Sequence, residues 1–132
     1  FSMGIGDRFG RQGKAQLAAF ILAAQKGAEI IPVWNKSNRE HLIVHSEPGE
    51  VRIEADAAVK ALGWKHSYHV DADHIGIKTV DRFIAPSDFF YHRCRGLYRE
   101  TRRRFCHCRP GPRFAQALRR AGHRAFVFAY EH

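Results

Sequence analysis

Apolar and polar positions alternate along the first 90 residues in a rhythm of short strands and longer helices. Four segments have the pattern of strands, at residues 2–5, 29–34, 66–70 and 87–90. Three segments between them carry apolar residues at helical spacing, at residues 14–26, 48–63 and 79–84. This order predicts an α/β protein with a parallel sheet and right-handed crossovers.

A polar segment follows each of the first three predicted strands. These segments are Gly6–Gly10, Asn35–Glu40 and Asp71–Ile75. The carboxyl ends of parallel strands share one edge, so the three segments are expected to gather on one rim. Three such segments favour a (β/α) TIM-type barrel, of which residues 1–90 would be the N-terminal part. A doubly wound sheet is the alternative.

The segment Tyr68–Ile75 combines strand alternation with two carboxylates and an imidazole. Carboxylates and imidazoles bind metals and move protons, so a catalytic strand end is one interpretation. The other interpretation is a polar turn in which Asp71 or Asp73 caps the next segment. The pattern itself leaves both open.

Charge divides the chain at Phe90. Residues 1–90 contain 6 Lys, 5 Arg and 11 acidic residues, which sum to zero, whereas residues 91–132 contain 11 Arg, no Lys and two Glu, which gives the whole net charge of +9. All three cysteines also lie in the second part. Residues 1–90 and 91–132 therefore need separate explanations.

The sequence contains neither an apolar run of membrane-spanning length nor an N-terminal leader pattern, which predicts a cytoplasmic protein without a membrane partner. It begins with Phe1 rather than Met, and the first predicted strand starts at once. We therefore expect the recorded start to lie inside a longer protein.

Three motifs carry a resemblance to a known family. In chain order they are Gly6–Gly10 (GDRFG), Val33–His41 (VWNKSNREH) and Val70–His74 (VDADH). Over residues 2–90 the chain resembles the tagaturonate epimerase family, whose members are much longer. The resemblance implies a barrel-type α/β enzyme that uses a divalent metal cation, of unknown identity here, to interconvert the sugar acids tagaturonate and fructuronate.

The resemblance implies that Asp73 is the proton acceptor and His74 a metal ligand. Abstraction of a proton beside a ketone does require a base and a group that stabilises the enediolate charge. Arg8, Lys36 and Arg39 would suit a substrate carboxylate, with Asp7 and Asn35 as further substrate contacts; the alternative for these residues is a solvated loop. One His is not a metal site. The resemblance implies that the other ligands and the proton donor lie downstream of this chain, which would therefore be inactive alone.

Residues 91–132 depart from the family. A back-translation of residues 91–104, with codons chosen to suit, gives the family's expected next strand at all fourteen positions once a single base after the Phe90 codon is removed. A shifted frame in GC-rich DNA also explains the abundant Arg and absent Lys. We therefore interpret residues 91–132 as a frameshifted, poorly ordered, non-native basic tail.

The tail has two other interpretations. Arg102, Arg103 and Arg104, with aromatic residues nearby, would suit a small basic protein that binds nucleic acid. Cys94, Cys106, His107 and Cys108 could ligate zinc, but their spacing lacks the usual pairs, and we regard this as the weaker alternative.

Overall fold

A computed structural model of the chain describes residues 1–76, 78–92, 116 and 126–127. Its elements, in chain order, are β1 (Ser2–Gly6), α1 (Gly13–Gln25), β2 (Ile31–Ser37), α2 (Asn38–Val44), α3 (Pro48–Leu62), β3 (His69–Ile75), α4 (Asp81–Ile84), β4 (Phe89–His92) and β5 (Phe126–Val127). All strands pair in parallel, in the order β1-β2-β3-β4-β5. The predicted mixed α/β fold with a parallel sheet is confirmed; closure into a barrel stays a prediction.

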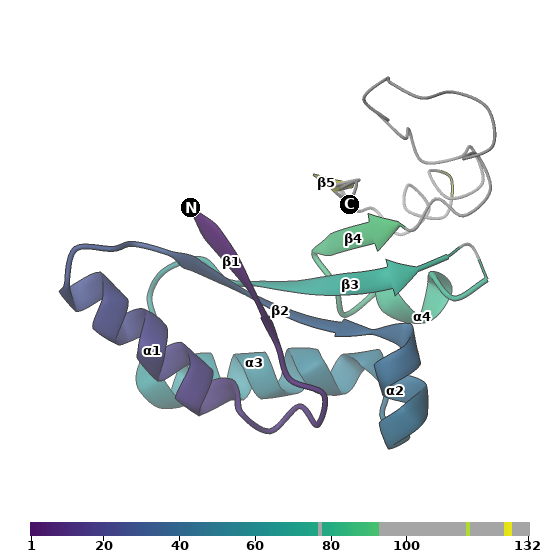
Figure 1. Ribbon diagram of the computed structural model, residues 1–132, viewed down its shortest axis with the longest axis horizontal. Coiled ribbons are helices and arrows are strands. Elements are labelled where there is room, and N and C mark those ends of the chain that lie inside the picture. The colour runs from purple at the N-terminus through teal and green to yellow at the C-terminus, as the bar shows by residue number, and fades with distance from the viewer. Residues whose placement is uncertain (77, 93–115, 117–125, 128–132) are drawn as a thin grey trace, which may run out of the picture.

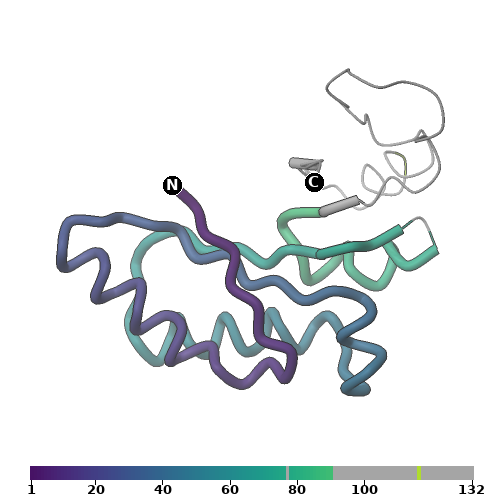
Figure 2. Tube along the Cα trace, in the orientation of Figure 1, coloured from purple at the N-terminus to yellow at the C-terminus, as the bar shows by residue number. Residues whose placement is uncertain are grey.

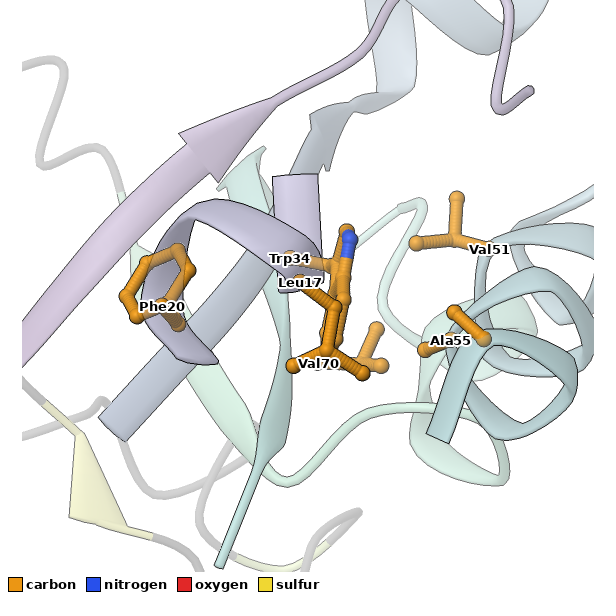
Figure 3. Packing of buried hydrophobic residues seen from close by; sticks show 7 residues of the cluster. Leu17, Phe20, Trp34, Val51, Ala55 and Val70 are labelled. Atoms are coloured by element: carbon orange, nitrogen blue, oxygen red, sulfur yellow. The ribbon is translucent and has the colours of Figure 1, made fainter. Parts of the chain in front are cut away.

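Helices α1 and α3 lie side by side against one face of the sheet (Figure 1). Trp34 of β2 and Val70 of β3 point to this face, where they pack with Leu17, Phe20 and Ala55 of the two helices (Figure 3). Because side chains alternate along a strand, the residues between them face the other way. Asn35 and Asp71 therefore lie on what we call the open face, over which the described part of the chain places no helix (Figure 2).

A second, smaller core joins β3 and β4 to α4. It consists of Ala72, Ile75, Val80, Phe83 and Phe90, each at most 1% exposed. At the opposite end of β4, Arg52 of α3 donates to Asp88 at 2.5 Å, and Asp88 accepts from the Val70 backbone at 3.0 Å. These contacts fix the start of β4 against α3 and β3.

Two predicted boundaries were wrong. The segment after Trp34 is not a polar loop, because β2 continues to Ser37 and α2 follows directly. The third strand starts at His69 rather than at residue 66, so His66 precedes the strand. Ser37 explains the first error: it caps α2 while still extended, which ends the strand and starts the helix without a loop.

Several predictions concern residues outside those described. The arginine cluster 102–104, the cysteines 94, 106 and 108 with His107, and the frame change all lie there, apart from the first two residues of the tail. Strand β4 runs to His92, two residues past the predicted division at Phe90. The division into 1–90 and 91–132 stays a prediction. Among the described helices, none is long and apolar enough to span a membrane.

Candidate functional site

The carboxyl ends of β1, β2 and β3 meet at one edge of the sheet. Ser37 is in register with Asp73, and Gly6 with Asn35. This register brings the segments after Gly6, Ser37 and Asp73 together, as the strand order predicted. Ligands of open α/β sheets bind at such an edge.

On the open face, Asn35 lies between two glycines of β1 and Asp71 of β3. A Cβ atom at Gly4 would lie 3.3 Å from Asn35 Nδ2, and one at Gly6 would lie 3.2 Å from Asn35 Oδ1. The two glycines therefore leave room for the Asn35 amide across β1. On its other side Asn35 is in register with Asp71, which in turn is in register with Phe89.

Asp71 is a member of this face to which the sequence pattern assigned no individual role: it was one of the two carboxylates of a possible catalytic strand end, or a possible cap. Burial raises its pKa to about 6, and the neighbouring Asp73 carboxylate adds to this, while His74 acts in the opposite direction. Asp71 can therefore carry a proton close to neutral pH. The signal in the sequence was the i, i+2 spacing of Asp71 and Asp73, which places both on one face of a strand.

Asp73 and His74 form a direct pair at the end of β3. His74 Nδ1 lies 2.6 Å from Asp73 Oδ1, and His74 has a φ of 51°. This left-handed conformation coincides with a break in the β3–β4 register between Ala72 and Ile75. It turns the His74 side chain out of the alternation of the strand and places it beside Asp73. Metal-binding histidines are often oriented by a carboxylate that contacts their other ring nitrogen. Because Asp73 makes this contact through Oδ1, its Oδ2 can accept a proton from another group.

The described residues contain no group of three or more His, Cys, Asp or Glu side chains that could hold a metal ion. The Asp73–His74 pair suits one metal ligand and its orienting carboxylate. A site with three or more protein ligands would therefore need ligands from outside the described residues.

Asp7 shapes the loop after β1. Its carboxylate accepts backbone hydrogen bonds from Phe9 at 3.0 Å, Arg11 at 2.6 Å and Gln12 at 2.5 Å. Burial alone would raise its pKa, but these bonds and one from Gly10 outweigh burial and lower the pKa of Asp7. The carboxylate that we predicted as a substrate contact thus holds the loop before α1.

Lys36 lies on the helix-covered side of β2 and not with Asn35 on the open face. Its side chain is 3% exposed, and Nζ donates to Ser46 Oγ at 2.8 Å. Burial lowers the pKa of Lys36, while the carboxylates of Glu50, Asp7 and Glu40 act to raise it. The structure therefore does not bring Lys36 together with Asn35 and Asp71.

The two predicted arginines differ in their surroundings. Arg8 is exposed, and its Nε lies 3.7 Å from Glu40, the residue that completes the α2 cap. Arg39 is exposed on α2. Both are close in sequence to the strand-end rim.

Sequence reasoning missed the buried contacts of Ser46. Besides Lys36, its Oγ lies 2.9 Å from His41 Nδ1, and the His41 ring packs edge-on against Phe83 of α4 at 5.6 Å. Burial lowers the pKa of His41 to about 4, and the charges of Lys36 and Arg82 contribute to this shift. No pattern signalled this cluster, since His41 lies on the seven-residue helix α2, which was not predicted, and Ser46 lies in the short segment between α2 and α3.

No protein-family model and no curated protein matches this chain. The fold resembles the crystal structure of the fructuronate-tagaturonate epimerase UxaE from Cohnella laeviribosi with one glycerol, at a TM-score of 0.59 and 23% identity. A two-glycerol structure of the same enzyme gives a TM-score of 0.55, also at 23% identity. The matches cover 70% and 69% of this chain but only 19% and 18% of that enzyme. The resemblance expected from the sequence is thus confirmed for the fold, and for a segment of the longer enzyme.

Proposed function

We propose that residues 1–90 are the first segment of a barrel-type sugar-acid epimerase that interconverts tagaturonate and fructuronate. The observation that carries the proposal is the Asp73–His74 pair at the carboxyl end of β3, beside Asn35 and Asp71. The fold similarity to an epimerase of this kind supports it. A parallel sheet with helices on one face is also the arrangement from which a barrel wall is built.

In this proposal Asp73 is the general base. Its Oδ2 would accept the proton from the carbon beside the ketone, while Oδ1 holds the His74 ring. His74 would provide one ligand for a divalent cation, whose chemistry here is to stabilise the enediolate oxygens as a Lewis acid. Asp71, with its raised pKa, would stay partly protonated near pH 6 and so add less negative charge beside the base.

Substrate binding would draw on the same rim. The Asn35 amide can both donate to and accept from sugar hydroxyls. Arg8 and Arg39 can bind a carboxylate in a bidentate manner. Lys36, which is buried behind the strand, would act on the rim through its charge rather than by contact.

The chain spans about a fifth of the length of the enzyme that it resembles, so we propose that it is inactive alone. The test is to delete one base after the Phe90 codon, express the open reading frame that follows, and assay tagaturonate–fructuronate interconversion with added divalent metals. We expect activity from the restored frame, at least about a thousandfold less from its Asp73→Asn variant, and none from the 132-residue chain. A restored frame that reads no further strands, or turnover by the short chain, would refute the proposal.

A second candidate function is nucleic-acid binding through residues 91–132, because that segment carries the entire net charge of +9. Such binding depends on counterion release and weakens steeply with salt. An affinity of the 132-residue chain for RNA that falls about a hundredfold or more between 50 and 200 mM salt, and that is lost in an Arg102→Ala, Arg103→Ala, Arg104→Ala variant, would favour this function. Salt-insensitive or absent binding would exclude it.

A further inference from the structure

A cavity of about 470 Å³ lies between the loop after β1 and the junction of α2 and α3. Its lining residues are Phe9, Gly10, Arg11, Val44, His45, Ser46 and Glu50. None of them belongs to the set on the open face, so the cavity is a separate feature of the rim. Its volume is within the range of about 300–1,000 Å³ that is usual for small-molecule sites.

The backbone amides of this cavity already have partners. The Gly10 amide donates to the Asp7 carbonyl at 3.1 Å, the Arg11 amide to the Asp7 carboxylate, and the Ser46 amide to the His41 carbonyl at 3.0 Å. Phosphate sites in loops use such amides as donors. Because these amides are engaged, a ligand must be recognised by side chains, which argues against a phosphate group.

The side chains offer one cation and several hydroxyl partners. The exposed Arg11 forms no ion pair with any described residue, and its guanidinium is suited to a carboxylate. Glu50 uses Oε1 for the Glu47 amide at 2.8 Å, which leaves Oε2 to accept from a ligand hydroxyl. The Phe9 ring, in a residue that is 71% exposed, adds an apolar surface.

Ser46 contributes a hydroxyl whose position is fixed by the buried side chains of Lys36 and His41. Lys36 donates to Oγ at 2.8 Å, and His41 Nδ1 lies 2.9 Å from the same atom. If His41 accepts the Ser46 proton, Oγ keeps one lone pair; if His41 donates, Ser46 keeps its proton. In either state Ser46 retains one hydrogen-bonding position, and a ligand hydroxyl can satisfy both states because it donates and accepts.

We propose that this cavity binds a hydroxylated monocarboxylate of the sugar-acid type, with Arg11 on the carboxylate and with Ser46 and Glu50 on hydroxyls. The site is distinct from the Asp73–His74 pair. The inference does not depend on the proposed function, because Arg11, Ser46 and Glu50 have no role in the proposed reaction.

The test titrates the 132-residue chain with three probes and measures affinity by calorimetry. D-glucuronate carries both a carboxylate and hydroxyls, D-glucose only hydroxyls, and acetate only a carboxylate. We expect glucuronate to bind at least about tenfold more tightly than either of the others. Equal affinity for glucuronate and acetate, or no glucuronate binding, would overturn the proposal.

Variants locate the site. Arg11→Gln removes the guanidinium charge but keeps the amide that holds the Asp7 loop, and we expect it to weaken glucuronate binding about tenfold or more. Glu50→Gln keeps an acceptor for the Glu47 amide and should weaken binding to a smaller extent. Lys60→Gln, which removes an exposed cation that neither lines the cavity nor has a role in the proposed reaction, should leave binding unchanged. Loss of binding in Asp73→Asn with full binding in Arg11→Gln would place the ligand on the open face and refute the inference.

Discussion

Two titratable side chains near the sheet respond to burial in opposite directions. The pKa of His41 falls to about 4 and that of Asp71 rises to about 6, and in each case burial is the largest cause. Both shifts favour the neutral form of the residue. Between about pH 4 and 6, His41 binds a proton more readily in the unfolded chain than in the folded protein. Asp71 does the reverse and holds its proton more tightly in the folded protein. Their effects on stability therefore partly cancel in that window.

Replacement of His41 should show how much its titration contributes to the pH dependence of stability. Between pH 6.5 and about 4 the unfolded chain binds the His41 proton more readily, so this residue makes the folded state less stable as pH falls, by an amount on the order of 3 kcal/mol. His41→Gln is expected to lower stability at pH 7, because the contacts to Ser46 and Phe83 are lost, yet to show less loss on acidification than the wild type. Urea denaturation from pH 7.5 to 4 measures this. His66→Gln, at an exposed position, should keep the wild-type pH dependence.

Asp71→Asn should have the opposite consequence. With an ordinary pKa of 3.8 and a folded pKa of about 6, Asp71 contributes stability at low pH that is lost as pH rises through this range, on the order of 3 kcal/mol. The variant should therefore be more stable than the wild type at pH 7 and similar at pH 4. The matched control is Asp81→Asn, at an exposed carboxylate. Equal pH profiles for wild type and Asp71→Asn would mean that the Asp71 carboxyl is not buried as described.

At the scale of elements, periodicity predicted the long helices well and the strand ends poorly. Helix α3 was expected at residues 48–63 and spans Pro48–Leu62, because its apolar stripe, Pro48 and Gly63 all agree. Strand β3 was placed too early because the alternation that continues it uses Asp71 and Asp73, whose polar side chains face the open side and not a core. Helix α2 has seven residues, too few to show a period. Polar residues at a candidate site thus conceal the element that carries them.

The cap of α2 allows a direct test at this scale. Ser37 Oγ accepts from the Glu40 amide at 3.3 Å, and the Glu40 carboxylate accepts from the Ser37 amide at 2.9 Å. Ser37→Ala should cost about 1 kcal/mol of unfolding free energy, and Ser37→Thr much less, because a β-branched hydroxyl still caps. Ser67→Ala, at an exposed serine outside the helices, is the control. If the alanine variants at 37 and 67 lose the same stability, the cap contributes nothing.

At the scale of the whole molecule, the described sheet is covered on one side only. Parallel sheets are normally buried on both faces, and an edge strand with unpaired backbone groups attracts other chains. In the described part of the chain β1 pairs only with β2, and Phe1 and Met3 are among its exposed apolar residues. In a longer protein of the kind that the fold resembles, further strands would cover this edge. The described residues leave this edge open, so a second copy of the chain can pair with it.

We therefore expect the 132-residue chain to self-associate through β1. Met3 is 55% exposed on this strand, and Met3→Lys places a charge where a neighbouring strand would pair, a device that edge strands use against association. Light scattering after size-exclusion chromatography should show a lower mass for this variant than for the wild type at the same concentration. Leu22→Lys, at a residue 58% exposed on α1, removes a similar apolar side chain away from the edge and should keep the wild-type mass. A monomeric wild type would show that the β1 edge does not drive association. Dissociation by Leu22→Lys alone would show that the contact between copies forms through the helices.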